Sequence, residues 1–558
     1  MEARRSQLGV RLLPSLTDFA FLMPVVFLFA RMGGLQTLLG DCDTGWHIRT
    51  GEWILAHHAV PARDIFSFSK PGETWYAWEW LAEVIFAWLN RHGGLAAIAL
   101  LGIALLSVTF TLLFRLVRAR SNAIVAIAVT IVAAAGSAIH WLARPHLFTL
   151  LFLVIFCAAL ERVRAGKARI AGLPVLAVLP AATILWTNLH GGFFVGIVLI
   201  ASYGAGEMLR MLFTGEPAER LRARAAGGQY LLSAVGCLAA SLVNPYTYHL
   251  HMHVAQFLRD PYPQTVIMEY LSLSFHHPIA VFFEAMLMLA CLASFWYISA
   301  GSLIEPVILL MWAHAGLLSS RNIPIFMIVA AAPVGAALAA WLRLVPEWNV
   351  AVWLRNSARK FNEIAGETTE TDAIPRWHLV SVAGMLAVAA VIYAPHPPKK
   401  FRAEFDPDRY PAKALDVLKQ DATARVFTFD QWGDYMIYRL YPHTKVFMDG
   451  RIDYYGDDFE KATIDVLNVK YGWDKTLDRY GVNTILMPPS ASLTGALKES
   501  SRWRVVYDDG TALVFRSTGR EQGSQESAAN RVGGEGRDRE VTKTLAREQA
   551  ITETKPKT

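Results

Sequence analysis

Long apolar runs recur along the first 395 residues of this chain, and they constrain its fold more than any other feature. A helix needs roughly 20 mainly apolar residues to cross the ~30 Å hydrocarbon core of a bilayer. Charged residues make up only 18% of the 558 residues, against roughly 25% in soluble proteins. The sequence therefore predicts an all-α polytopic membrane domain. We predict about eleven spans, at residues 17–39, 94–114, 122–141, 146–162, 171–187, 192–213, 229–244, 278–298, 303–318, 322–343 and 378–395.

Basic residues are divided unevenly between the loops that join these spans. Clusters of arginine and lysine follow the second, fourth, sixth and tenth predicted spans, whereas the loops between them hold isolated arginines. Basic loops remain in the cytoplasm. We therefore predict a cytoplasmic N-terminus and, with an odd number of spans, an extracytoplasmic C-terminal region. This distribution also accounts for the net charge of +6 without a nucleic-acid partner.

Three segments lie outside the predicted spans. The first external loop, 40–93, carries Trp75, Trp78 and Trp80, a pattern that fits either an interfacial helix or an aromatic belt. Residues 396–518 are predicted to form a small α/β domain after the membrane domain, 1–395. Its strands are expected at 425–430, 445–450 and 482–488, with a hairpin of 505–507 and 512–516 around the turn Asp508-Asp509-Gly510. The tail, 519–558, has no aromatic residue and mixed charge, which predicts disorder.

Acidic and basic groups follow directly on the first apolar run. Asp41, Asp43 and His47 lie where the chain leaves the bilayer, and acidic groups so close to lipid usually mark a working site. One of the two aspartates is predicted to be the catalytic base or to orient the acceptor, and we favour Asp43. Asp41 can instead cap a helix that begins there.

The other polar motifs fall on the same predicted external side. Each alone is explained by the polar needs of a helix end, but together they predict an external cavity lined by carboxylates and cations. They are Arg144 and His146 after the third span, Asn188 and His190 after the fifth, and Arg321 and Asn322 after the ninth.

This set of groups suits the transfer of a sugar from a polyprenyl phosphate. Cations hold the charge of the leaving phosphate, and a carboxylate on the opposite face activates the acceptor with inversion. A divalent cation bound by Asp41 and Asp43 remains an alternative. The sequence has no Walker loop, G-x-G-x-x-G fingerprint or CxxC pair, so nucleotide-driven and redox chemistry lack support.

The chain resembles the GT-C superfamily of integral membrane glycosyltransferases over nearly its whole length except the tail. These include protein O-mannosyltransferases, the aminoarabinose transferase of lipid A and the core galacturonosyltransferases. The resemblance rests on Asp41-x-Asp43-x-x-Trp46-His47-x-x-x-Gly51-Glu52, Pro61-x-x-Asp64-x-Phe66-Ser67, Glu79-Trp80, Asn188-x-His190-Gly191-Gly192, Arg321-Asn322 and Asp449-Gly450-Arg451-x-Asp453-x-Tyr455-Gly456.

The resemblance implies a hexosyl- or pentosyltransferase of the bacterial cytoplasmic membrane. Its donor would be a polyprenyl-phosphate sugar and its acceptor an envelope glycan, lipid or protein. An acidic residue of the first loop is essential in the superfamily, which points to Asp41 or Asp43, while many members need no metal. His47 and Glu79 are expected to contact substrate, and Arg451 and Asp453 either bind the acceptor or form structural pairs.

Two other functions compete with this reading. A transporter of lipid-linked glycans would show charges in the middle of its spans or paired broken helices, whereas the polar groups here lie at span ends. Arg31, within the first span, is the exception. A non-catalytic scaffold that retained the fold would tolerate the loss of both aspartates.

Overall fold

The computed structural model describes residues 11–170, 172–421 and 423–519, which fall into two units. The first unit takes in the chain up to Ile65, residues 72–407 and the short segment 452–457; the second takes in 66–71, 408–451 and the chain from Asp458 on. The predicted disordered tail, apart from Gly519, lies outside the described residues.

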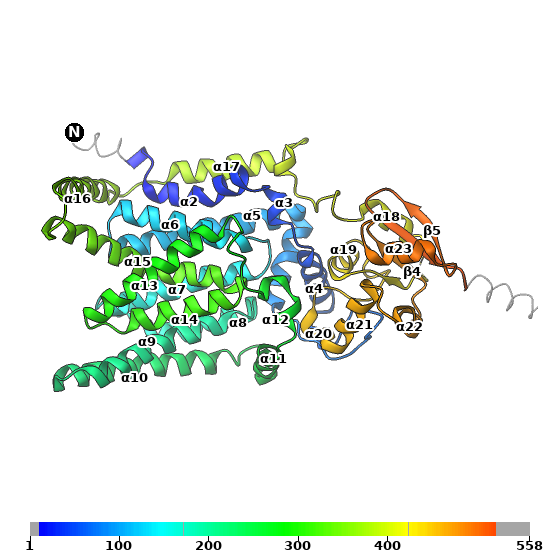
Figure 1. Ribbon diagram of the computed structural model, residues 1–558, viewed down its shortest axis with the longest axis horizontal. Helices are drawn as coiled ribbons and strands as arrows, with labels where there is room; N and C mark the ends of the chain where they lie inside the picture. Colours follow the sequence, from blue (N-terminus) through cyan, green and yellow to red (C-terminus); the bar gives the residue numbers. More distant parts are fainter. Residues whose placement is uncertain (1–10, 171, 422, 520–558) are drawn as a thin grey trace, which may run out of the picture. The chain divides into compact units, whose positions relative to one another are not determined.

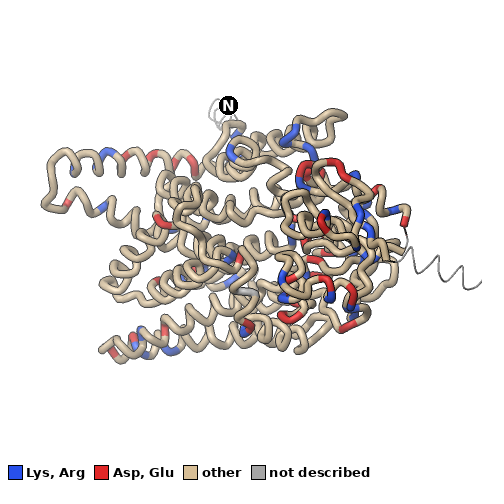
Figure 2. The backbone as a smooth tube through the Cα atoms, turned by 45° about the vertical axis from the view of Figure 1, so that its right-hand side comes forward, with Lys and Arg blue, Asp and Glu red and all other residues tan. Residues whose placement is uncertain are grey.

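The first unit is a bundle of apolar helices that run side by side (Figure 1). The apolar helices are α5 (Trp80–Arg120), α6 (Ala123–Ser137), α7 (His146–Arg164), α8 (Val175–Leu189), α9 (Phe193–Phe213), α13 (Ala280–Ser299), α14 (Ile304–Leu318), α15 (Ile323–Leu344) and α17 (Leu379–Ile392). Two further long helices, α10 (Pro217–Ala240) and α16 (Val352–Asp372), carry more polar residues. Helix α15 lies at the centre, against α5, α6, α7, α13 and α14, and nearly all of its first seventeen residues are buried. Figure 2 colours the backbone by residue type, and charged residues are sparse along the helices of the bundle.

Every predicted span contains a helix, but the number of spans is not confirmed as eleven. Among the described residues, six helical segments are long and apolar enough to cross a membrane, and α8, α14 and α17 are shorter apolar helices. The first predicted span is interrupted: α2 (Leu16–Val26) passes into a π-helical turn, Phe27–Arg31, and then into α3 (Leu35–Leu38). Pro24 lies inside α2 and has no N–H to donate, which favours such an irregularity.

The first loop carries one complete helix and the start of another. Helix α4 (Asp43–His57) follows α3 directly, whereas Trp75 and Trp78 lie in non-helical chain before α5. Gly94, at a φ of 63°, breaks the geometry of α5, so residues 80–93 form a separate helical piece ahead of the apolar span. The smaller elements of the unit are α11 (Tyr248–Arg259), α12 (Pro263–Val266), η3 (Met268–Tyr270), η4 (Ser320–Asn322), η5 (Val345–Glu347), η6 (Lys399–Phe401), α20 (Ile452–Tyr455), η2 (Ala138–His140) and a two-stranded ribbon of β1 (Arg169–Ile170) and β2 (Leu173–Pro174).

The second unit is a four-stranded sheet with helices, as the sequence predicts for its α/β domain. The strand order is β3 (Val426–Phe427), β4 (Thr484–Met487), β6 (Leu513–Ser517) and β5 (Trp503–Asp508); β3 and β4 are parallel and the other pairs antiparallel. The helices are α18 (Ala412–Leu418), α19 (Asp430–Leu440), α21 (Asp457–Leu467), α22 (Trp473–Arg479) and α23 (Ser492–Glu499).

One predicted strand of this unit is wrong. The hairpin turns at Gly510 as expected, with a φ of 81° that favours glycine. Residues 445–450, in contrast, form no regular strand. Val446 makes only an isolated bridge with Ser67 of the first loop, because the segment pairs there instead of entering the sheet.

Candidate active site

Backbone contacts hold the two aspartates of the first loop against the loop between α6 and α7. Ala143 donates its N–H to the Leu38 carbonyl at 2.7 Å, and Thr44 Oγ1 donates to the Ala143 carbonyl at 2.9 Å. Asp41 Oδ1 accepts the N–H of Asp43 at 2.9 Å, where α4 begins. The N-cap residue of α4 is Cys42, so Asp41 forms a turn just before the helix and is not its cap residue.

Arg144 bridges both aspartates. Its Nη1 lies 2.7 Å from Asp41 Oδ2 and its Nη2 lies 2.6 Å from Asp43 Oδ2. Burial works to lower the pKa of Arg144, but Asp43, Asp41 and Glu269 outweigh it and raise that pKa well above its usual value. The guanidinium group is thus a permanent cation between the two carboxylates.

A second cation joins the same cluster through Glu269, in η3. Glu269 Oε2 lies 4.0 Å from Arg144 Nη1, and Glu269 Oε1 lies 2.5 Å from Arg321 Nη1. Arg321 also donates to the Tyr270 hydroxyl at 3.0 Å. Burial would raise the pKa of Glu269, but Arg321 and Arg144 lower it, so this carboxylate is ionised. The structure brings Arg144 and Arg321 together, as the sequence predicts.

Glu79 sits between two histidines. Its Oε2 lies 3.4 Å from His47 Nε2, and its Oε1 lies 3.2 Å from His190 Nε2. His47 Nδ1 lies 3.3 Å from Glu83 Oε1, one helical turn along from Glu79. Burial raises the pKa of Glu79 to about 7; Arg144 and Arg321 act against this rise and Asp453 adds to it. Burial, with Arg144 and His190, lowers the pKa of His47 well below its usual value.

The hydrogen bonds of His190 assign its tautomer. The backbone N–H of Gly192 donates to Nδ1 at 2.9 Å, and Thr149 Oγ1 lies 2.8 Å from the same nitrogen. Burial, with Arg321 and His146, lowers the pKa of His190 well below its usual value, so the ring is neutral. A nitrogen that accepts a backbone N–H carries no proton. Nε2 therefore carries the hydrogen, and it points to Glu79.

Position 192 has no space for a side chain, because His190 and Thr149 lie directly against its backbone. A Cβ at position 192 would lie 2.6 Å from Thr149 Oγ1 and 2.8 Å from His190 Nδ1. Thr149 in turn accepts the indole N–H of Trp186 at 2.9 Å. The His-Gly-Gly motif thus orients a histidine toward Glu79 and leaves space for its partners.

Gly51 allows α4 to pack directly on α5. A Cβ at this position would lie 1.9 Å from the carbonyl oxygen of Glu83 and 2.4 Å from its carbonyl carbon. No side chain can move aside to relieve this overlap, since both atoms belong to the backbone. His47 lies one turn before Gly51 on α4. The close approach of α4 to α5 at Gly51 brings its ring within 3.4 Å of Glu79 and 3.3 Å of Glu83.

Gly51→Ala is therefore expected to separate α4 from α5. We expect a loss of about 1–3 kcal/mol in stability, as for overpacked cores, together with a loss of activity as His47 leaves the two carboxyl groups. Thermal unfolding in detergent measures the first effect. Gly228→Ala is the matched control: it too is in a helix of the bundle, but its Cβ would meet no atom within 4 Å. Equal behaviour of the two variants would contradict the close approach.

Three predicted site residues hold the surroundings in place. His146 Nε2 donates to the His140 carbonyl at 2.8 Å, and its ring centre lies 6.4 Å from that of His190. Asn322 Nδ2 donates to the Ala315 carbonyl at 3.2 Å. Asn188 accepts the indole N–H of Trp80 at 2.7 Å and donates to the Ile184 and Val243 carbonyls. These contacts favour a positioning role over direct contact with substrate.

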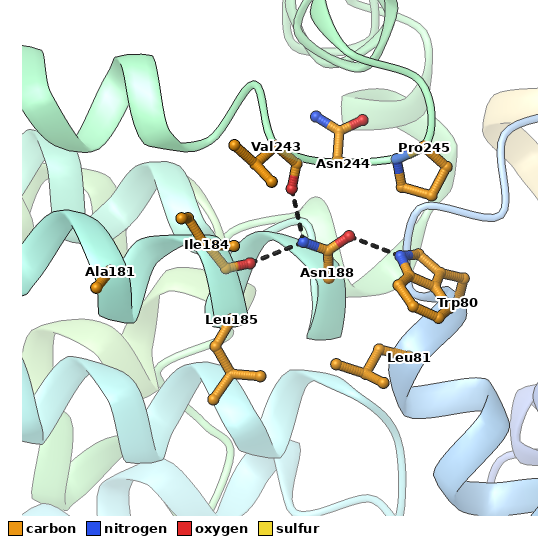
Figure 3. A pocket seen from close by; sticks show the side chains of 9 residues that line it. All are labelled: Trp80, Leu81, Ala181, Ile184, Leu185, Asn188, Val243, Asn244 and Pro245. Atoms are coloured by element: carbon orange, nitrogen blue, oxygen red, sulfur yellow. Dashed lines mark hydrogen bonds between the residues drawn. The ribbon is translucent and has the colours of Figure 1, made fainter.

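Asn188 also lines an open, mainly apolar groove of about 530 Å³ (Figure 3). Figure 3 shows its amide between the indole of Trp80 and the backbone of Ile184 and Val243. The groove lies at the N-terminal end of α5, directly after Glu79 in the chain.

The two predicted residues of the C-terminal region have different surroundings. Arg451, in the second unit, is buried, pairs with Asp449 at 2.7 Å and stacks over Phe66, a geometry that favours a structural pair. Asp453 belongs to the first unit and lies 2.9 Å from His253 Nε2. It is close enough to Glu79 to affect the pKa of that residue.

The carboxylates do not form a metal-binding set. Among the described residues, no group of three or more His, Cys, Asp or Glu side chains is arranged to hold a metal ion. A cation between Asp41 and Asp43 would have to displace Arg144 from both of them. The displaced guanidinium would keep only the longer contact with Glu269, at 4.0 Å, and loss of the close partners of a buried charge costs several kcal/mol. The residues present therefore do not fit a divalent ion at this pair.

Sequence reasoning did not single out several members of the cluster. Glu83 shares the inner face of α5 with Glu79, four residues earlier, so an acid at that spacing among apolar residues was the available signal. Glu269, Tyr270 and His253 lie on the long segment after α10. Glu269 falls on the predicted external side but was not among the predicted site residues, because no local pattern there indicates which residues turn inward.

No family model and no curated protein matches the chain. Solved structures do match it, at low identity. The archaeal oligosaccharyltransferase AglB from Archaeoglobus fulgidus, in complex with an inhibitory peptide and a dolichol-phosphate, aligns with a TM-score of 0.52 and 11% identity over 92% of this chain and 75% of its own. The oligosaccharyltransferase of Archaeoglobus fulgidus tethered by a disulfide bond to an acceptor peptide containing the NVT sequon gives the same TM-score and identity over 92% of this chain and 74% of its own. AglB is a GT-C superfamily glycosyltransferase, so the chain has a GT-C-like fold, which confirms the resemblance at the level of fold.

Proposed function

We propose that the protein is a membrane glycosyltransferase that moves a sugar from a polyprenyl-phosphate donor to an acceptor. The main observation that supports this proposal is a cluster of ionised side chains at one end of an apolar bundle: Asp41, Asp43, Arg144, Glu269 and Arg321. Ionised groups that are buried next to lipid are costly and usually functional. The similar fold of AglB, solved with a dolichol-phosphate, supports a lipid-linked donor.

Arg321 is the cation best placed to receive the donor phosphate. Its side chain is 30% exposed, whereas that of Arg144 is 17% exposed and both of its terminal nitrogens face aspartates. The leaving phosphate is a weak base, so a cation that stabilises its charge is sufficient and no general acid is needed. Arg144 holds the carboxylates in position and adds its charge to the site.

Asp43 is proposed to orient the acceptor group. It begins α4, one turn before His47, and Arg144 fixes its carboxylate from one side. Attack from the face opposite the phosphate would invert the anomeric centre. Asp453 approaches the same region together with His253, so the segment 452–457 is proposed to contribute to the acceptor side.

We propose further that Arg144 takes the place of a divalent cation. Its guanidinium group already neutralises the two aspartates that a metal would use. Sugar transfer is therefore expected to be unchanged after treatment with a chelator, and purified protein should bind no Mn²⁺ at this pair by electron paramagnetic resonance. Loss of transfer on chelation, restored by the metal, would contradict this assignment.

We infer the orientation of the protein from the distribution of its basic loops. We propose a bacterial cytoplasmic membrane location with the N-terminus inside and the site outside. A reporter fused after Ser517 should then be active only outside the cytoplasm. The scaffold and transporter alternatives have less support, because the buried ionised cluster lies at the ends of spans instead of along a path through their middle.

The decisive experiment compares envelope glycans, glycolipids and glycoproteins from cells with and without the protein. The proposal expects one class to lose a sugar, and it expects Asp43→Asn to reproduce that loss at normal protein levels. An unchanged envelope, together with failure of purified protein to consume any polyprenyl-phosphate sugar, would overturn the enzymatic function. The scaffold reading would then replace it.

A further inference from the structure

His47 lies between two carboxyl groups on the same helix face. Glu79 and Glu83 are four residues apart at the start of α5, and they approach opposite nitrogens of the imidazole, at 3.4 and 3.3 Å. The side chains of His47 and Glu83 are each only 1% exposed. Among the described residues, His47 Nε2 makes no hydrogen bond, although it faces Glu79.

The surroundings of Glu79 disfavour its charged form. Burial raises the pKa of Glu79 most strongly, and Arg144 and Arg321 lower it. Arg144, whose charge reaches both Glu79 and His47, is already paired with Asp41 and Asp43. A buried carboxyl group in such a site keeps its proton to a higher pH than an exposed one.

Glu79 is the member of this set that can exchange its proton. It is 8% exposed, whereas Glu83 is fully buried. Titratable and charged groups face Glu79 from every neighbouring element: His47 on α4, His190 after α8, Arg144 before α7, Arg321 on η4 and Asp453 on α20. The Nε2–H of His190 points to one carboxyl oxygen and stabilises the ionised form, while burial opposes it.

Resting on the proposed function, we propose that Glu79 is the group that receives the proton of the acceptor, and that His47, which faces Glu79 and Glu83, holds it in position. In this step the bond between the acceptor atom and its hydrogen breaks, and the acceptor atom bonds to the anomeric carbon. The bond from that carbon to the phosphate oxygen breaks, and its electron pair stays on the phosphate. The proton passes to a carboxylate oxygen of Glu79.

Asp43 is less suited to this task because Arg144 favours its ionised form. A guanidinium 2.6 Å from a carboxylate weakens it as a base. A general base is most effective when its pKa lies near the working pH, which the pKa of Glu79, about 7, satisfies. Asp43 therefore orients the acceptor. Glu79, which faces His47 one turn further along α4, takes the proton.

Two measurements test this assignment on full-length protein in detergent. The first is the pH dependence of sugar transfer. Because only ionised Glu79 accepts a proton, turnover should be low below pH about 7 and rise as pH passes through that value. Glu79→Gln should lower kcat about 10²- to 10⁴-fold, with little change in the KM of the donor, and should remove this pH dependence. Glu219→Gln, at an exposed position on α10, is the control and should match wild type.

The second measurement does not depend on activity. Difference infrared spectroscopy across neutral pH should show the carbonyl stretch of a protonated carboxyl group that disappears as pH rises. Glu79→Gln should abolish the titrating band, and Glu83→Gln should shift its midpoint. Absence of the band in wild type, or its survival in Glu79→Gln, overturns the proposal, as does full turnover of Glu79→Gln. If wild type transfers no sugar at all, the proposed function fails, and the infrared titration still decides whether Glu79 holds a proton.

Discussion

Replacing Asp43 by Asn is expected to reduce sugar transfer about 10²-fold or more, the effect of a reacting group that loses its orientation. The substitution keeps the size of the side chain but removes the charge that pairs with Arg144 at 2.6 Å and that would hold the acceptor. The KM of the donor should change little, since the phosphate is assigned to Arg321. Single-turnover transfer with purified protein measures the effect.

Asp41→Asn is the matched comparison for this variant. Asp41 also pairs with Arg144, but its other oxygen accepts the N–H of Asp43 in the turn before α4. An asparagine oxygen can accept the same N–H, so this variant should retain most of its activity. If Asp43→Asn transfers at the wild-type rate, Asp43 is not the orienting group. If both variants transfer sugar at the wild-type rate, a non-catalytic scaffold function is favoured over the enzymatic one.

Arg144→Ala is expected to have the larger effect on the protein as a whole. It removes the cation that Asp41 and Asp43 share in a mostly buried site, while Glu269 keeps its pair with Arg321. Removing one partner of a buried ion pair typically costs about 3–5 kcal/mol, so unfolding in detergent should occur at a markedly lower temperature. Transfer should fall by at least as much as in Asp43→Asn, because the aspartates lose their common support.

Arg144→Lys separates charge from geometry. Lysine supplies one ammonium group, which cannot bond to two carboxylates in the paired manner of a guanidinium. We expect it to recover part of the stability but little of the activity. Arg222→Ala, which breaks an exposed pair with Glu219, should change stability by less than about 1 kcal/mol. Wild-type stability of Arg144→Ala would contradict the buried pairing.

The helices of the bundle were predictable because each contains a long apolar run, and this pattern depends on local sequence alone. The interruptions within these helices were harder to predict. Gly94 separates residues 80–93 from the apolar span within α5, and Pro24 precedes a π-helical turn in the first run. The strand wrongly predicted at 445–450 has a different cause. Its partner is Ser67, nearly four hundred residues away in the chain, and no local pattern indicates such a pairing.

The candidate site was predictable where a motif lies at the end of a span. Asp41, Asp43, Arg144 and Arg321 were named from sequence, and the structure places them in one cluster. Glu269 was not included because it lies in a long segment without periodic pattern. The function of Gly51 could not be read from sequence either, since it depends on how closely two helices cross.

The short segment 452–457 has a consequence for how such a protein can be divided or recombined. The chain leaves the second unit at Arg451, gives six residues including Asp453 to the first unit, and returns at Asp458. The second unit also takes 66–71 from the first loop, where Phe66 stacks on Arg451 and Ser67 bridges to Val446. A fragment that begins at residue 408 would lack these partners, and a truncated membrane part would lack Asp453. The two units are therefore not interchangeable modules, and a chimera has to exchange both short segments along with the larger parts.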